Sequence, residues 1–531
     1  MATPQTSGGA EYAAPAAVER SAWDRRKWYI LAAICVAQFM VVLDIAIVNV
    51  ALPSIRTDLG FTNESLQWVL TAYAILFGGF LLLGGRLADR FGRRRIFMLG
   101  LVVFAGASLM CGLSWSEGSL ITFRAVQGFG GALLSPAALS ILATTFTEGR
   151  ERNLALGIWG GIAGSGAAAG TLLGGVLTSA FGWQWIFFVN VPIGAVLVGL
   201  TPFLLTREQR GAIGRSGFDV AGAVTVTGGL MVLVYALTRA VQIGWSAGET
   251  ITLLAVAAAL LASFVVIEIR AANPILPRRL LSLPVPRTAN IVGMLVGVAL
   301  FSQFFLLTLY LQQVLGYSAL KTGVAYVSTT VTLVVVAVIA QALVTRVGPR
   351  AIMVTGLLFV SASILLYTRI PVTGASYVSD LLPPFLLSGI GLGFTFVPIQ
   401  IAALTGVRPM EAGAASGMIN TSQQIGGAVG LAAITTVATT VTTNYLKSHA
   451  PSQLAAATGL VHGFHIAFYV LLGVVLAAVV LTATLLRGAK VAETGVVEEP
   501  GEAAGAPGRP APAFDAIRSG DAPDEEERRA A

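Results

Sequence analysis

One acid and one base differ from the other charged residues because each lies well inside an apolar run. Asp44 falls within 28–52 and Arg124 within 118–142. If both runs are helices, the two residues lie roughly 12 and 9 Å below the same surface, at about 1.5 Å per residue. A direct or water-bridged Asp–Arg pair is therefore geometrically possible. Such a carboxylate can take up and release a proton as its surroundings change. The alternative is a static ion pair that fixes helix packing.

The chain around these two residues is strongly apolar. Of its 531 residues, 55% are hydrophobic and 11% are charged, against roughly 25% charged residues in a soluble domain. The mean hydropathy is +0.80. There is too little polar surface to cover such a core in water, so lipid must be the solvent for most of the chain.

Fourteen apolar runs are long enough to cross a bilayer, which predicts an all-α polytopic membrane protein. The predicted spans are 28–52, 67–86, 95–115, 118–142, 153–179, 184–206, 218–239, 248–269, 288–312, 322–345, 350–369, 379–405, 413–442 and 462–486. Twenty-three of the 33 lysines and arginines fall in loops on one side of these spans and five in loops on the other. Basic loops stay inside, so we expect a multi-pass protein of the cell membrane with both termini cytoplasmic. The net charge of +7 is thus a topology signal and does not indicate nucleic-acid binding.

Loop lengths and basic clusters divide the spans into six, two and six. We predict a cytoplasmic segment (1–27), a six-helix bundle (28–206), a two-helix insertion with its flanking loops (207–287), a second six-helix bundle (288–487) and a disordered cytoplasmic tail (488–531). The tail is rich in Ala, Gly, Pro and Glu and has too little apolar content to fold. Paired bundles of this kind are typical of transporters built from repeats.

The predicted loop after the second span carries glycines and charges at fixed spacing. It reads Gly85-Arg-Leu-Ala-Asp89-Arg90-Phe-Gly92-Arg93. The glycines allow a tight turn and close helix approach, and Asp89 can meet the positive N-terminal end of a neighbouring helix. The loop resembles the signature loop of the major facilitator superfamily, which implies a conformational latch. The alternative is a loop that is merely basic.

Two further motifs resemble the 14-helix drug:proton antiporter branch of that superfamily. Leu43-Asp44-Ile-Ala-Ile-Val-Asn49-Val-Ala-Leu-Pro53 is similar to its first-helix motif. Arg124-Ala-Val-Gln127-Gly128-Phe-Gly130 is similar to its fourth-helix motif. The resemblance implies that Arg124 takes part in proton transfer, with Asp44 as the titrating partner.

The fifth span resembles the antiporter glycine motif of the branch, with glycines at Gly157, Gly166, Gly170, Gly174 and Gly175. The chain has Thr171 where the motif usually has proline, and threonine does not kink a helix as proline does. The segment that begins Trp183-Gln184-Trp and ends Asn190-Val-Pro192-Ile-Gly194 also fits, with glutamine in place of the usual arginine.

Polar and aromatic residues on otherwise apolar spans are candidates to line a substrate cavity. They are Gln38, Asn49, Trp68, Tyr73, Gln303, Tyr310, Gln313, Gln341, Asn420 and Gln424. Each has an alternative role as an interhelical hydrogen bond. His465 is a secondary titrating candidate. We expect no metal and no cofactor, because the sequence has no CxxC, no clustered histidines and no GxxxxGK[ST] phosphate loop.

These features predict a transporter and not an enzyme. The resemblance implies a proton-coupled antiporter that exports drug-like or antibiotic compounds by alternating access, driven by the proton gradient. A cavity with one carboxylate suits amphipathic neutral or mildly charged substrates better than dications. Proton-coupled import of a small nutrient, a non-transporting sensor and a respiratory pump subunit are the alternatives. The glycine motif argues against the importer, and the intact Asp44–Arg124 pair argues against the sensor. The lack of mid-membrane Lys and Glu residues argues against the pump subunit. No obligate protein partner is evident.

Overall fold

The computed structural model describes residues 14–206, 219–271, 274–450 and 452–486, apart from some side chains within helices. These residues form helices joined by short connections, and no strand occurs among them. Thirteen described helices are long and apolar enough to cross a membrane. The remaining predicted span lies in α6 (Arg150–Phe181), which is helical throughout but includes side chains outside the described set. The prediction of an all-α polytopic membrane protein is confirmed. The predicted tail, 488–531, lies outside the described residues.

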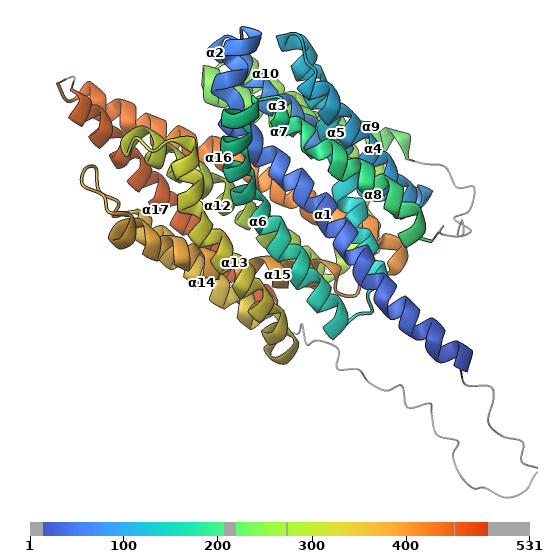
Figure 1. Cartoon of the computed structure of the whole chain (residues 1–531). Coiled ribbons are helices and arrows are strands. Elements are labelled where there is room, and N and C mark those ends of the chain that lie inside the picture. Colours follow the sequence, from blue (N-terminus) through green and yellow to red (C-terminus); the bar gives the residue numbers. More distant parts are fainter. Residues whose placement is uncertain (1–13, 207–218, 272–273, 451, 487–531) are drawn as a thin grey trace, which may run out of the picture. The chain divides into compact units, whose positions relative to one another are not determined.

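The first part of the chain is built around α5, the helix that carries Arg124. The elements are α1 (Ala14–Leu59), α2 (Asn63–Leu66), α3 (Trp68–Phe91), α4 (Arg93–Gly112), α5 (Glu117–Thr145), α6, α7 (Trp185–Phe188) and α8 (Asn190–Leu204). Helix α5 packs on both α3 and α4, while α1 packs on α6 (Figure 1). Of the most apolar stretch of α5, 83% is buried, the largest share among the thirteen spans. Ser116 starts α5 by accepting the backbone N–H of Ser119, the usual role of an N-cap serine.

The second part begins with a helix pair that packs on the rest. The elements are α9 (Val220–Ile243), α10 (Gly248–Arg270), α11 (Arg278–Ser282), α12 (Pro284–Leu309), η1 (Tyr310–Val314), α13 (Ala319–Val347), α14 (Pro349–Tyr367), η2 (Tyr377–Leu381), α15 (Leu382–Leu404), η3 (Pro409–Glu411), α16 (Ala412–Lys447) and α17 (Gln453–Leu485). Helix α9 contacts α10, α3 and α16, whereas the apolar window of α10 is only 17% buried. The division into two bundles and an insertion stays a prediction.

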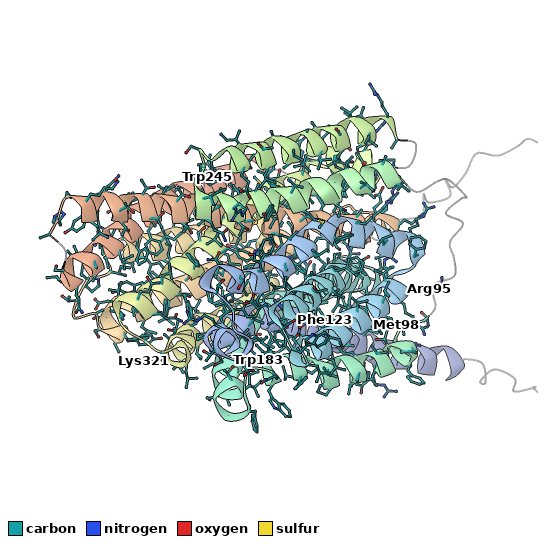
Figure 2. The ribbon with its side chains drawn as sticks, turned by 90° about the horizontal axis from the view of Figure 1, so that it is seen from above. Arg95, Met98, Phe123, Trp183, Trp245 and Lys321 are labelled. Carbon is teal, nitrogen blue, oxygen red and sulfur yellow. The ribbon has the colours of Figure 1, made fainter. Side chains whose placement is uncertain are left out.

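Two opposite ends of the helices matter for the site. We call the end with the α3–α4 and α15–α16 connections the latch end, and the opposite one the far end. Figure 2 shows Arg95 and Met98, on α4, toward one end and Trp245 and Lys321 toward the other. At the latch end, Gly92 ends α3 with φ of 96°, a backbone conformation that glycine adopts without strain, and α4 starts at the next residue.

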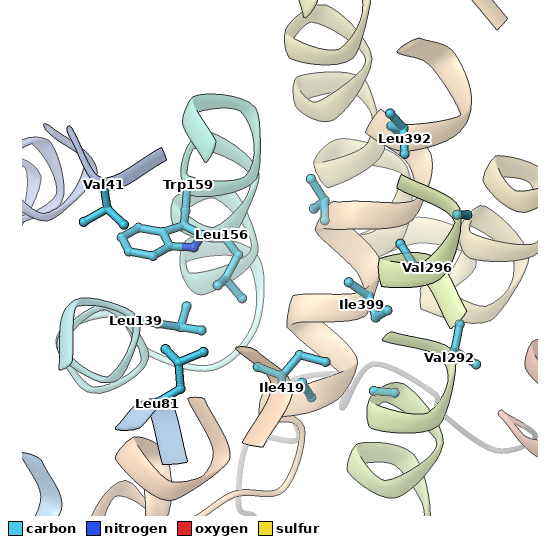
Figure 3. Packing of buried hydrophobic residues seen from close by; sticks show 14 of the residues in the cluster. Val41, Leu81, Leu139, Leu156, Trp159, Val292, Val296, Leu392, Ile399 and Ile419 are labelled. Carbon is cyan, nitrogen blue, oxygen red and sulfur yellow. The ribbon is translucent and has the colours of Figure 1, made fainter. Parts of the chain in front are cut away.

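Apolar side chains fill the interior and join the two parts of the chain. Figure 3 shows buried residues of α1, α3, α5 and α6 near buried residues of α12, α15 and α16, namely Val41, Leu81, Leu139, Leu156, Trp159, Val292, Val296, Leu392, Ile399 and Ile419. Contacts between the two parts run mainly from α6 to α13 and from α3 to α16. In lipid, such contacts depend on close packing more than on exclusion of water.

Candidate functional site

Asp44 on α1 and Arg124 on α5 form a buried ion pair. Their exposed fractions are 0% and 1%. Arg124 Nη1 donates to Asp44 Oδ2 at 2.6 Å, and Nε donates to the carbonyl of Val69 at 3.1 Å. Their similar depths allowed either a direct or a water-bridged pair, and the contact is direct. Removing one partner of a buried pair leaves the other charge uncompensated, which typically costs about 3–5 kcal/mol. The pair therefore holds α1, α3 and α5 together and places a carboxylate inside the protein.

Three neutral side chains complete the surroundings of Asp44. Gln127 Nε2 and Asn190 Nδ2 donate to Asp44 Oδ1 at 2.8 and 3.1 Å. The same two nitrogens donate to Ser108 Oγ at 3.1 and 3.0 Å. Gln127 Oε1 accepts from Arg124 at 2.6 Å. We call Asp44, Arg124, Gln127, Asn190 and Ser108 the Asp44 cluster.

Sequence analysis missed the neutral members of this cluster. One signal was available for Gln127, because a residue three positions after Arg124 shares its helix face. Asn190 is the first residue of α8, and its side chain is 0% exposed. It reaches Asp44 only because α7 and α8 pack beside α1, which no local pattern reveals. Ser108 on α4 donates to the carbonyl of Phe187 at 3.0 Å and so ties the cluster to α7.

Aromatic rings seal the Asp44 cluster. The guanidinium carbon of Arg124 lies 4.4 Å from the ring centre of Tyr73 and 5.7 Å from that of Phe187. Tyr73 is 3% exposed and stacks on Phe77. These rings add cation–π attraction and keep the site in surroundings of low dielectric. Two buried polar atoms at the site have no hydrogen-bond partner among the described residues, the Tyr73 hydroxyl and Asn190 Oδ1.

Glycines of α6 bring that helix against the turn of α1 that carries Asp44. A Cβ added at Gly166 would lie 2.9 Å from Val42, one at Gly170 would lie 2.7 Å from the carbonyl of Leu43, and one at Gly174 would lie 2.9 Å from the carbonyl of Ile47. Real Cβ atoms hardly ever come so close, so larger residues would push α1 away. Three of the five motif glycines thus position α1.

The other two motif glycines face α13. A Cβ added at Gly157 would lie 2.8 Å from the side chain of Gln341, and one at Gly175 would lie 3.3 Å from Leu320. The glycine pattern therefore serves two neighbours, α1 on one face and α13 on the other. The side chain of Thr171 lies outside the described set.

At the latch end, Asp89 accepts two backbone hydrogen bonds from the start of α16. The N–H groups of Gly413 and Ala414 lie 2.8 Å from its two oxygens. These belong to the first turn of a helix, where N–H groups lack helical partners and the helix dipole favours an anion. Arg93 contacts Asp89 Oδ1 at 3.5 Å and also donates to the carbonyl of Pro409. The carboxylate thus joins α3 to α16.

The latch glycines have separate roles. Both glycines were predicted to lie in a loop, but α3 continues through Gly85 to Phe91, and only Gly92 forms the turn. A Cβ at Gly85 would lie 2.1 Å from the carbonyl of Gly413, so Gly85 allows α3 and α16 to touch. The guanidinium of Arg90 lies 6.0 Å from the ring centre of Phe91.

A second charged group near the latch was missed. Glu411, 5% exposed, accepts from Arg279 at 3.0 Å and from Arg408 at 2.6 Å. Arg279 lies on α11, the short helix between α10 and α12. It also donates to the carbonyl of Gly406 at 3.3 Å. Glu411 thus joins α11 to the start of α16.

Most cavity candidates take part in packing bonds. Five contact another part of the chain: Gln38 accepts from Ser135, Tyr310 donates to the Pro371 carbonyl, Gln303 on α12 donates to Ser388 on α15, Gln341 packs against Gly157, and Tyr73 lies over Arg124. Asn49 and Asn420 donate to carbonyls one turn earlier in their own helices. Gln313 is exposed and Gln424 is half-buried. Their role in a cavity stays a prediction.

Two remaining candidates lie toward the far end. Trp68, 37% exposed, has its ring centre 5.7 Å from that of Tyr235 on α9. His465 on α17 has Nε2 2.9 Å from the carbonyl of Ile370. Within the described part of the chain, neither residue makes a hydrogen bond or an ion pair with the Asp44 cluster.

Comparison with known proteins places the chain in a family. The family model described as Major Facilitator Superfamily matches residues 34–431. The chain belongs to this superfamily. It is 41% identical over 490 residues to the puromycin resistance protein pur8 of Streptomyces alboniger, covering 92% of this chain and 96% of that protein. It is 40% identical over 429 residues to the cephamycin export protein CmcT of Amycolatopsis lactamdurans, covering 80% and 87%.

A third relative and one solved structure extend the comparison. The chain is 34% identical over 412 residues to the tetracenomycin C resistance and export protein of Streptomyces glaucescens, covering 77% and 75% of the two chains. The crystal structure of the human organic anion transporter MFSD10 superposes with a TM-score of 0.61 at 15% identity, covering 86% of this chain and 99% of that one. This likeness supports the major facilitator fold alone.

Proposed function

We propose that this chain is a proton-coupled antiporter that exports amphipathic, drug-like or antibiotic compounds across the cell membrane by alternating access. The observation that carries the proposal is the buried Asp44–Arg124 pair, a titratable carboxylate inside a transporter of the major facilitator superfamily. The relatives named for puromycin resistance, cephamycin export and tetracenomycin C export support the direction and the class of substrate.

The orientation follows from charge. The latch end carries most of the basic loops, so we assign it to the cytoplasm, with both termini on that side. The bonds from Asp89 to the start of α16 join the two parts of the chain at this end. The proposal assigns this arrangement to a state closed toward the cytoplasm, and it requires these bonds to break when the transporter opens inward.

The proton gradient supplies the energy without a bound cofactor. Each unit of pH difference provides about 1.4 kcal/mol per proton, and a potential of 100 mV adds about 2.3 kcal/mol per charge. In the described state Arg124, Gln127 and Asn190 all donate to Asp44, an arrangement that matches the acceptor-only character of an ionised carboxylate. A change in helix packing that removes these donors favours the protonated form, and that alternation couples the proton to the substrate.

A transport assay with purified full-length protein tests the proposal. The protein is reconstituted in liposomes with its cytoplasmic side facing outward, and the lumen is set about two pH units more acidic than the outside. Labelled puromycin is then added outside. One proton exchanged per substrate supports about a hundredfold accumulation, because each pH unit is worth a factor of ten. We expect wild type to accumulate puromycin and to release luminal acid. Asp44→Asn is expected to lose accumulation while it keeps downhill exchange.

The matched control is Glu117→Gln, which removes a carboxylate at the start of α5 outside the Asp44 cluster. It is expected to behave as wild type. Accumulation by Asp44→Asn equal to wild type would contradict proton coupling through Asp44, and accumulation driven by the opposite gradient would indicate an importer. Strong transport of a dication such as dequalinium would contradict the expected substrate class.

A further inference from the structure

We propose that the side-chain amide of Asn190 responds to the protonation state of Asp44. Its Nδ2 faces the ionised carboxylate, and a half-turn of the amide brings its Oδ1 to the protonated one. The inference rests on the proposed function, because it requires Asp44 to gain and lose a proton. It adds a positioning residue to the coupling site.

Every hydrogen bond from the described residues to Asp44 comes from a donor. Arg124 donates to Oδ2, and Gln127 and Asn190 donate to Oδ1. An ionised carboxylate only accepts, so this arrangement fits the anion. A protonated carboxyl has one O–H group that must donate to an acceptor. Protonation of Asp44 therefore leaves an unpaired donor unless a neighbour presents an acceptor.

Of the three donors to Asp44, only Asn190 has an acceptor atom to spare. Arg124 has no acceptor atom. Gln127 already uses both ends, since Oε1 accepts from Arg124 and Nε2 donates to Asp44 and Ser108. Asn190 Oδ1 is buried and has no hydrogen-bond partner among the described residues. In either orientation of this amide, one of its two polar atoms has no partner. The protonation state of Asp44 therefore decides which orientation is favoured.

The other charged and titratable groups around Asp44 do not offer this exchange. Among the described residues, these groups are Tyr73 on α3, Cys111 on α4 and Arg124 on α5. Helix α6 faces Asp44's turn of α1 with glycines. The Cys111 thiol lies 3.7 Å from Gln127 Oε1, and the Tyr73 ring covers Arg124. The Tyr73 hydroxyl also has no hydrogen-bond partner among the described residues, but it lies beside Gly131 of α5, where an added Cβ would be 3.2 Å from it.

The turn of the amide would also change how α8 is held. Asn190 starts α8, and Val189 separates it from α7. In the described orientation, Asn190 Nδ2 donates to Ser108 Oγ, and Ser108 donates to the carbonyl of Phe187 on α7. Turning the amide removes the first bond and offers Ser108 a new acceptor in competition with Phe187. A proton on Asp44 would thereby loosen the junction of α7 and α8.

Infrared difference spectra between high and low pH test the inference directly. The carboxylic C=O band that disappears in Asp44→Asn identifies protonated Asp44. Leucine has the same number and branching of side-chain heavy atoms as asparagine but no acceptor, so in Asn190→Leu we expect this band to move to higher frequency, as for a carboxyl that has lost a hydrogen bond. Asn190→Ser keeps a group that donates and accepts, and we expect its band to stay near that of wild type.

In wild type with isotope-labelled asparagine, the side-chain amide band of Asn190, identified by its loss in Asn190→Ser, should shift over the same pH range as the Asp44 band. This arm needs no folded leucine variant. In the transport assay, Asn190→Leu is expected to lower the rate about tenfold, the size expected for an unpaired buried donor, and Asn190→Ser about threefold or less. A purely structural role gives the reverse order, because leucine fills the space better than serine.

The outcomes separate the two proposals. Absence of any Asp44-dependent carboxyl band across the pH range of transport would contradict proton coupling through Asp44. A band that is present in wild type but unshifted in Asn190→Leu would overturn the inference alone, as would an asparagine band that does not respond to pH.

Discussion

Asp44 and Asp89, two of the buried carboxylates among the described residues, are held in different ways. Asp44 is bound by the side chains of Arg124, Gln127 and Asn190, which all lie on helices of the first part of the chain. The side chain of Asp89 is 2% exposed and is bound by two backbone N–H groups at the start of α16, more than 300 residues away in the sequence. One site is local, and the other joins two parts of the chain.

This difference indicates what each carboxylate can report. Side-chain donors can turn about their own bonds, so the surroundings of Asp44 can change while the helices stay in place. Backbone donors point along their helix and are lost only when α3 and α16 separate. We therefore expect Asp44 to respond to protons and Asp89 to respond to the distance between helices. The two functions need not share any residue.

The largest expected effect comes from Asp89→Asn. The amide loses the negative charge and can accept only through one oxygen, and a hydrogen bond to a charged group contributes about 1.5–3 kcal/mol. The equilibrium should shift about tenfold to a hundredfold toward states in which α3 and α16 are apart. Spin labels at Phe91→Cys and Met410→Cys, two exposed sites beside the latch, measure that distance by pulsed electron resonance.

The matched variant is Asp44→Asn in the same labelled background. It should shift the equilibrium at the latch by less than Asp89→Asn does, because Asp44 acts on α3 and α16 only through helix packing: within the described part of the chain, no hydrogen bond or ion pair joins the Asp44 cluster to α16. A shift as large as that of Asp89→Asn would show that the two carboxylates are strongly coupled and that the separation argued above is wrong.

Two adjacent glycines sharpen the comparison by steric means. A Cβ at Gly85 would lie 2.1 Å from the carbonyl of Gly413 on α16, whereas one at Gly84 would lie 2.3 Å from the carbonyl of Ala132 on α5. Overpacking costs about 1–3 kcal/mol in either place. Gly85→Ala should widen the latch distance with little loss of thermal stability, and Gly84→Ala should lower stability without widening the latch.

The measurements are thermal unfolding in detergent and the same spin-label distance. If Gly84→Ala opened the latch as widely as Gly85→Ala, the contact between Gly85 and Gly413 could not be what sets the distance. The pair is well matched because both substitutions add one methyl group to the same turn of α3.

The comparison also shows what a single sequence can predict. The similar depths of Asp44 and Arg124 followed from their positions in two apolar runs, and their direct contact is present. The sequence showed that Asp89 can meet a helix N-terminus but not which helix it meets, because the partner lies far along the chain. Charged residues in lipid are rare enough to stand out, and that rarity made Asp44 and Arg124 recognisable, whereas Asp89 was recognised by the spacing of its loop motif.

Neutral residues gave no comparable signal. Gln127 and Asn190 were visible only as parts of motifs, since an amide on an apolar helix has the same sequence context whether it binds a carboxylate or a neighbouring backbone. Gly85 and Gly92 were together assigned to a tight turn and to close helix approach, because a local pattern cannot distinguish a glycine that bends the chain from one that admits another helix. Tertiary contact decides both cases.

The smallest expected effect tests whether the latch extends beyond Asp89. Glu411→Gln removes the charge that binds Arg279 of α11 and Arg408. The arginine side chains are 43% and 61% exposed, so solvent screens both pairs and the expected loss is about 1 kcal/mol or less. The equilibrium between closed and open latch, measured by the spin-label distance, should shift less than tenfold toward the open state. The control is Glu148→Gln, which changes a 54% exposed acid paired with Arg152.

Salt separates this effect from that of Asp89. Raising the ionic strength from 0.1 to 1 M shortens the screening length from about 10 to about 3 Å. The difference between wild type and Glu411→Gln should therefore shrink at high salt, whereas the effect of Asp89→Asn, a buried group bound by backbone N–H groups, should persist. An effect of Glu411→Gln that matched Asp89→Asn and resisted salt would make α11 part of the latch itself.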